Sequence, residues 1–117
     1  AEQSILGGAN YFQKNLNRLS IEIPKLDRIW MALASYNLGF VNINLARELT
    51  VKRGGNPDLW SNVSIYLPEI LIQRYAVEGS EFEKHLQALE YVERIQLYYS
   101  TLSILNREEE MLLLAIN

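Results

Sequence analysis

Cysteine is absent from this sequence, and histidine occurs once, at His85. Without cysteine there can be no disulfide and no thiolate-ligated metal, and one imidazole is too few for an ordinary zinc centre. We therefore expect neither a metal site nor a cofactor. The cellular compartment stays open, because cysteine-free chains occur in the cytoplasm and in the periplasm alike.

The sequence also lacks an excess of basic charge and a long apolar run. Eleven Lys and Arg residues stand against fourteen Asp and Glu residues, which gives a net charge of -3. The basic residues are scattered rather than clustered, so we expect no nucleic-acid partner. No apolar run approaches the roughly 20 residues that span a bilayer, and the first residues lack a signal-peptide pattern. We expect no membrane contact by this segment, and any export signal or lipid anchor would lie outside it.

What is present fits a folded, helical domain. The chain has 117 residues, of which 49% are hydrophobic and 21% charged. This composition is typical of one globular domain or less. Near the start of the chain, apolar residues recur at helical spacing and predict a helix from Glu2 to Leu19. They are Ile5, Ala9, Phe12, Leu16 and Leu19. Gly7 and Gly8 inside it indicate close packing or a delayed helix start, and 20–24 is predicted as a loop.

The middle of the chain predicts a core helix from Leu26 to Leu38, which is apolar almost all round. Gly39 is placed to end it with a left-handed residue, and a second helix from Val41 to Leu49 is closed by the glycines at 54–55. Trp30 and Trp60 have spacings that fit core packing better than sugar stacking.

The next segments are punctuated by polar and proline residues. Asn56-Pro57-Asp58 predicts a helix start, capped by the asparagine, for a short helix that holds Trp60 and Val63. Pro68 is expected to interrupt that helix, with a brief turn over 69–75 and a loop over 77–80.

The longest regular stripe predicts one amphipathic helix from Glu81 to Ser103. His85 is expected to face solvent there. Asn106 with Glu109 has the spacing of a capping pair and predicts a last short helix. Since no strand-like alternation competes, the predicted fold class is all-α.

An ordered set of short sequence motifs, called words below, resembles motifs of the bacterial lytic murein transglycosylases, in particular of their membrane-bound F type. Residues 28–39, RIWMALASYNLG, are similar to that family's "RIW.ALAAYN.G" helix, and Tyr91-Val92-Glu93-Arg94-Ile95 is similar to its "YVENI" word. Between them, in the family's order, stand Ala46-Arg47, Gly54-Gly55-Asn56-Pro57-Asp58-Leu59-Trp60, Val63 and Leu67-Pro68. The resemblance spans about residues 1–102, and its specificity lies in the order of the words.

The resemblance implies a lysozyme-like, all-α transglycosylase domain without its N-terminal part, over residues 1–105, followed by a tail or short terminal helix over 106–117. It implies peptidoglycan as the partner and a parent protein of the periplasm, associated with the outer membrane. In the family, one glutamic acid protonates the glycosidic oxygen between MurNAc and GlcNAc and then accepts the proton of the muramoyl 6-hydroxyl. That hydroxyl closes to a 1,6-anhydro product, so no second carboxylate is needed as nucleophile.

The family's glutamate belongs to an "ES" word upstream of the matched segment, and no acid of this chain stands in that context. The resemblance therefore implies that this chain alone is inactive. Three substrate-binding residues carry over from the third family motif: Tyr36, Asn37 and Gly39. Tyr91 matches the catalytic-site tyrosine whose hydroxyl orients the glutamate. Without the resemblance, the Tyr36-Asn37 pair would be an ordinary helix end, and Tyr91 a core aromatic.

One stretch departs from the family pattern. Residues 77–84, VEGSEFEK, stand where the family has a "YGYARG" stretch, and Gln87 stands where a glutamate is expected. Two other hypotheses therefore stay open. The chain is a non-catalytic pseudoenzyme or helical module that binds glycan or protein, or it completes its core as a homo-oligomer through helix exchange.

Overall fold

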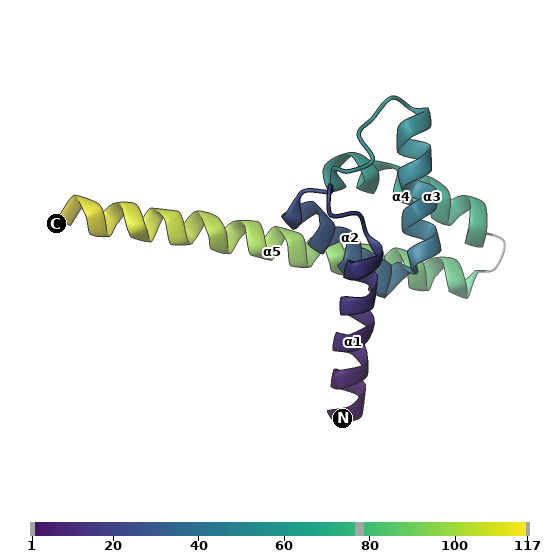
Figure 1. Ribbon diagram of the computed structural model, residues 1–117, viewed down its shortest axis with the longest axis horizontal. Coiled ribbons are helices and arrows are strands. Elements are labelled where there is room, and N and C mark those ends of the chain that lie inside the picture. Colours follow the sequence, from purple (N-terminus) through teal and green to yellow (C-terminus); the bar gives the residue numbers. More distant parts are fainter. Residues whose placement is uncertain (1, 77–78, 117) are drawn as a thin grey trace.

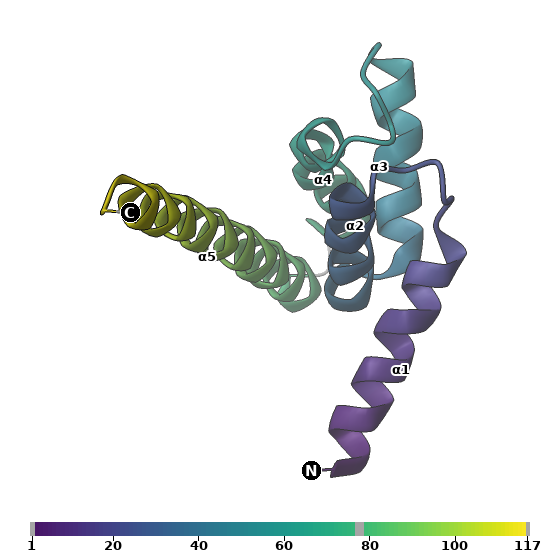
Figure 2. The ribbon, with the colours of Figure 1, turned by 60° about the vertical axis from the view of Figure 1, so that its left-hand side comes forward.

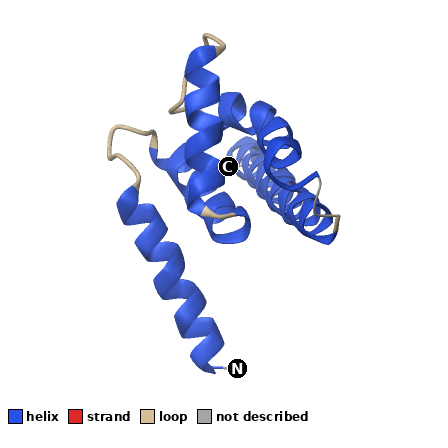
Figure 3. Ribbon diagram, turned by 90° about the vertical axis from the view of Figure 1, so that its right-hand side faces the viewer, coloured by secondary structure: helices blue, strands red, loops and turns tan. Residues whose placement is uncertain are grey.

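Five helices make up most of the described part of the chain, for which we use a computed structural model. The structure describes residues 2–76 and 79–116, with side-chain surroundings for 10–76 and 79–115. The helices are α1 (Glu2–Arg18), α2 (Lys25–Leu38), α3 (Phe40–Lys52), α4 (Trp60–Tyr75) and α5 (Ser80–Ile116). No strand occurs within these ranges (Figure 3), so the predicted all-α class is confirmed.

α2 is the central helix, because it contacts each of the other four. α3 and α4 pack together on one side of it, and α1 and the first half of α5 lie against its other faces (Figures 1 and 2). Both tryptophans are buried, as their spacing predicts. The core combines apolar side chains of all five helices and of the α1–α2 loop: Leu19, Ile23, Trp30, Met31, Ala32, Ala34, Leu38, Ile43, Ala46, Trp60, Val63, Leu67, Ile70, Leu71, Leu89 and Val92 from buried positions, with Phe12 and Leu16 of α1 packed against them.

The first three helices agree with the sequence-based boundaries within one to three residues. α1 begins at Glu2, so the glycines at 7–8 do not delay its start. Gly39 ends α2 with a φ of 95°, and its N–H donates to the Ser35 carbonyl at 2.9 Å. This positive φ strongly favours glycine, as expected from the sequence.

Pro68 does not interrupt α4, and that prediction is wrong. A proline inside a helix removes one hydrogen bond and costs about 3 kcal/mol relative to alanine. Leu67, Ile70 and Leu71 flank it and are buried against the core. Because burying each such side chain contributes about 1.5–3 kcal/mol, the packing outweighs the cost of the proline.

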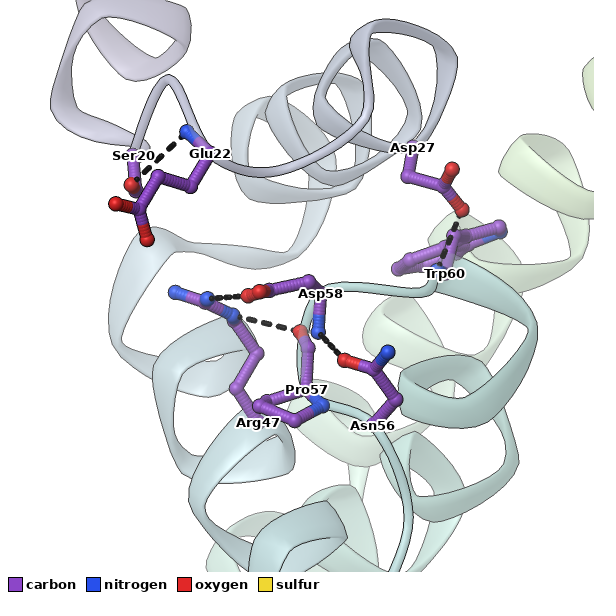
Figure 4. A network of polar contacts seen from close by, with 8 residues as sticks. All are labelled: Ser20, Glu22, Asp27, Arg47, Asn56, Pro57, Asp58 and Trp60. Atoms are coloured by element: carbon purple, nitrogen blue, oxygen red, sulfur yellow. Dashed lines mark hydrogen bonds and ion pairs between the residues drawn. The ribbon is translucent and has the colours of Figure 1, made fainter.

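The start of α4 also differs from the prediction. Asn56 does not cap the helix: its Oδ1 accepts from the Asp58 N–H at 2.9 Å and closes a turn before the helix begins at Trp60. The cap comes instead from α2, where Asp27 Oδ1 accepts from the Trp60 N–H at 2.9 Å (Figure 4). An acceptor 33 residues away cannot be recognised from local spacing.

The turn before α4 is tied to α3 by Arg47. Its Nε donates to the Pro57 carbonyl at 2.9 Å and its Nη2 to Asp58 Oδ1 at 2.8 Å (Figure 4). Two donors of one rigid guanidinium therefore fix the loop in a single orientation. The family-like word around Gly54 to Trp60 is thus a structural connection that holds α4 against α3 and α2.

α5 confirms the predicted long helix and extends beyond it. It continues through Asn106 to Ile116, so the predicted capping pair and separate last helix are wrong. From Ile104 to Ala115 every residue is exposed, and this part of α5 projects away from the other helices (Figure 1). The division of the chain at residue 105 stays a prediction. Of the predicted loop 77–80, residues 77 and 78 lie outside the described residues, Gly79 has a φ of 51°, and Ser80 already belongs to α5.

Among the described helices, none combines the length and the apolar character needed to cross a bilayer.

Candidate functional site

A hollow of about 550 Å³ opens where α2 ends and α3 begins. Residues of α1, α4 and α5 complete it. We call it the Asn42 hollow, and its described lining consists of Tyr11, Arg18, Asn37, Leu38, Gly39, Phe40, Val41, Asn42, Arg74, Tyr75 and His85. Its volume lies within the range of small-molecule sites, roughly 300–1,000 Å³.

Two of the predicted site residues, Asn37 and Gly39, line this hollow. Asn37 Nδ2 donates to the Leu33 carbonyl one turn earlier, at 2.8 Å. The Nδ2 group is thus hydrogen-bonded within α2, and Oδ1 is the part of the Asn37 amide that a ligand could use. Gly39 brings backbone to the rim without a side chain.

Tyr36 lies beside the hollow and does not line it. The residue is 44% exposed, and its ring meets the Tyr11 ring edge to face, with centroids 5.7 Å apart. Since Tyr11 does line the hollow, the two tyrosines form a continuous aromatic edge. Such an edge has the character of a surface on which a sugar ring can stack.

Tyr91 is separate from this group. It lies on α5 with 51% of its surface exposed, between the buried Leu89 and Val92, and it is not among the residues that line the hollow. The structure therefore brings Asn37 and Gly39 together, places Tyr36 next to them, and leaves Tyr91 apart. The proposed roles of all four residues stay predictions.

Asn42 is the polar centre of the hollow, and sequence reasoning missed it. It is 2% exposed, and its Nδ2 donates to the Leu38 carbonyl at 2.7 Å and to the Tyr75 hydroxyl at 3.0 Å. Arg74 Nη1 donates to its Oδ1. A buried amide is stable only when it is hydrogen-bonded, and here it joins α3 to the end of α4. An asparagine between Val41 and Ile43 in an apolar stretch was the available signal.

His85 does not simply face solvent, and this prediction is wrong. Its ring stacks on Tyr75 with centroids 4.0 Å apart and 13° between the planes. Its Nδ1 lies 2.7 Å from the Glu81 carbonyl. A local hydrogen bond and a stacked ring thus fix the imidazole at the hollow.

The charged lining is entirely basic. Arg18 and Arg74 lie at the hollow with exposed side chains, and no Asp or Glu is among the described lining residues. The Arg18 guanidinium sits 3.9 Å from the Phe40 ring centroid. Within the described part of the chain, ion pairs engage Arg47, Arg53 and Lys84, and neither arginine of the hollow.

The arrangement can bind a ligand, but its described residues offer no carboxyl group for acid–base chemistry on a glycosidic bond. No group of His, Asp or Glu among the described residues has the arrangement of a metal site. The hollow is therefore a candidate binding surface with aromatic, amide and guanidinium groups.

Several curated proteins similar to this chain carry the name membrane-bound lytic murein transglycosylase F. The protein of Alteromonas mediterranea is 44% identical over 108 residues, which is 92% of this chain and 23% of the relative. That of Photobacterium profundum is 44% identical over 103 residues, 86% of this chain and 20% of the relative. That of Shewanella woodyi is 38% identical over 113 residues, 96% of this chain and 24% of the relative. The chain thus spans less than a quarter of the length of these relatives, and no family model matches it.

Proposed function

Because the chain is related over most of its length to one segment of the membrane-bound lytic murein transglycosylases F, we propose that it forms one wall of a peptidoglycan-binding cleft in a lysozyme-like catalytic domain. The observation that carries this proposal is the Asn42 hollow, where Asn37 and Gly39 of the family word meet an aromatic edge. Tyr11 and Tyr36 supply apolar ring surface for a sugar, and Asn37 Oδ1 accepts from a hydroxyl or acetamido N–H.

In the parent protein, the reaction is cleavage of the MurNAc–GlcNAc β-1,4 bond with formation of 1,6-anhydro-MurNAc. A glutamic acid outside this chain protonates the glycosidic oxygen, and the Tyr91 hydroxyl orients that glutamic acid. The half-exposed position of Tyr91 supports this role, because another segment can reach it. The envelope is the corresponding location, the periplasmic side of the outer membrane.

The chain alone does not cleave glycan. None of the described residues that line the hollow carries a carboxyl group, so the carboxylic acid that protonates the leaving oxygen and deprotonates the muramoyl hydroxyl in the proposed reaction has no counterpart there. The same observation favours a second candidate function, a non-catalytic glycan-binding module. The two candidate functions, cleft wall of a catalytic domain and glycan-binding module, both predict that this chain alone is inactive. They differ only in whether the parent protein cleaves glycan.

Incubation of purified murein with the 117-residue chain tests the proposal that the chain alone does not cleave glycan. We expect no 1,6-anhydromuropeptides by mass spectrometry, and their appearance would contradict the proposed inactivity. The parent protein is expected to release them, and failure to do so would favour the binding module.

Binding is tested by titrating the labelled chain with a neutral chitooligosaccharide and following its amide resonances by NMR. We expect shifts at the Asn42 hollow and a several-fold weaker affinity for Asn37→Ala, about what one lost hydrogen bond is worth. Asn44→Ala is the matched control, because Asn44 is equally half-buried and does not line the hollow. Absence of shifts in the wild-type chain would refute the cleft wall.

A further inference from the structure

The Asn42 hollow has a charge that glycan binding alone does not require. The chain as a whole is acidic, with a net charge of -3. The described lining nevertheless contains Arg18, Arg74 and His85 and no carboxylate. A concave surface lined by one sign of charge concentrates ligands of the opposite sign.

The two arginines of the hollow differ from others in the chain. Arg47 and Arg53 pair with Asp58 and Glu69 at 2.8 Å, so their charge is used within the fold. Arg18 instead lies over the Phe40 ring, and Arg74 donates to the Asn42 amide and lies 5.3 Å from the Tyr75 ring centroid. Aromatic rings and an amide orient these guanidinium groups, and among the described residues no carboxylate forms an ion pair with either of them.

Both guanidinium groups are also reachable, because the side chains are exposed at the opening. Guanidinium is the group best suited to a planar carboxylate, since two parallel N–H donors match its two oxygens. Phe40 and Tyr75 restrict the orientation of these donors, which lowers the entropy lost when a ligand binds.

From this geometry we propose that the Asn42 hollow binds free carboxylates of the peptide stem that peptidoglycan carries, with Arg18 and Arg74 as the anion-binding residues. The inference rests on the proposed function, and it adds a peptide contact beside the sugar contact. Within this chain, the aromatic edge of Tyr11 and Tyr36 adjoins the arginines, so that a sugar and its attached peptide can be held together.

The test is isothermal titration of the 117-residue chain with N-acetylmuramoyl-L-alanyl-D-glutamate and with the same compound in which both glutamate carboxyls are amidated. We expect the acid form to bind about tenfold more tightly, because charge-assisted hydrogen bonds to guanidinium are lost on amidation. Equal affinities of the two forms would overturn the proposal, and this comparison needs no variant.

Variants then locate the contact. Arg18→Gln and Arg74→Gln are expected to reduce binding of the acid form to the level of the amidated form, with circular dichroism confirming the fold. Arg94→Gln is the matched control, since it removes the same charge from an exposed position of α5 outside the hollow. An equal loss for Arg94→Gln would contradict a local site and indicate an effect of net charge.

Two further ligands complete the test. One distinguishes a stem carboxylate from other anions, and the other distinguishes the carboxylate site from the proposed glycan-binding wall. Inorganic phosphate is expected to compete weakly, and displacement of the acid form at equal concentration would refute recognition of a stem carboxylate. The neutral chitooligosaccharide is expected to bind the arginine variants as it binds the wild type. If the chitooligosaccharide binds in this way while the acid and amidated forms bind equally, the proposed carboxylate contact is refuted and the proposed glycan-binding wall is still supported.

Discussion

Asp27 offers a sharp test of how the helices are held together. The Trp60 N–H is one of the four free amides at the start of α4, and Leu59, at the capping position, has no side-chain acceptor. Asp27 Oδ1 fills this role from α2 at 2.9 Å. Because Trp60 is only 1% exposed, water has little access to replace the carboxylate if it is removed.

We predict that Asp27→Ala lowers the free energy of unfolding by about 1–2 kcal/mol, as expected for the loss of a helix cap that leaves a shielded N–H without a partner. Asp27→Asn keeps an oxygen acceptor and is expected to lose about half as much. Asp27 also lies in the first turn of α2, where its charge contributes about 0.3–1 kcal/mol. Both variants lose that charge, so the difference between them measures the hydrogen bond to Trp60.

Urea unfolding followed by tryptophan fluorescence and by far-ultraviolet circular dichroism provides the measurement. Glu22→Ala is the control, because this exposed side chain lies in the neighbouring loop and should change stability by less than about 0.5 kcal/mol. The reasoning is refuted if Asp27→Ala has no larger effect than the control, or if Asp27→Asn is as damaging as Asp27→Ala.

Three other substitutions, with Gly54→Ala as a comparison for the third, test the packing. Asn15→Leu should stabilise the chain by about 1 kcal/mol in urea unfolding, because Asn15 is fully buried and its amide has no partner among the described residues; a loss would indicate an unseen partner. Leu67→Ala should cost about 2–5 kcal/mol and lower the thermal midpoint, whereas a loss under about 1 kcal/mol would mean that the site collapses. Gly55→Ala should destabilise the chain by about 1–3 kcal/mol in urea unfolding, because the added Cβ would lie 2.9 Å from Thr50 Cγ2. In Gly54→Ala the added Cβ meets no described atom within 4 Å, and the strain comes instead from the φ of 82°.

The sequence predicts most of the fold because its signals are local. Periodic apolar stripes define α1, α2, α3 and the first part of α5, and Gly39 marks a helix end by a conformation that glycine adopts easily. The errors arise where a distant contact outweighs a local preference. Pro68 stays helical because its neighbours are buried, and the cap of α4 comes from Asp27 rather than from Asn56.

The candidate site was predictable only in part. The resemblance identifies Asn37 and Gly39, and both line the hollow. Asn42 has a local signal, an asparagine in an apolar stretch, but its grouping with Arg74 and His85 could not be found from spacing. The three residues come from three helices and meet only after α3, α4 and α5 have packed. The stacking of His85 on Tyr75 likewise depends on a contact between residues of different helices.

The outer part of α5, from Ile104 to Ala115, has consequences for how the molecule unfolds. Its residues are all exposed, so its backbone hydrogen bonds depend on helix propensity alone, and an isolated helix of about 12 residues is marginal in water. Its amide hydrogens should therefore exchange with solvent within a short time, while those around Leu89 and Val92 exchange only on global opening. A gradual loss of helix signal on heating would come from this end, and the cooperative transition reported by the buried tryptophans would belong to the remainder of the chain.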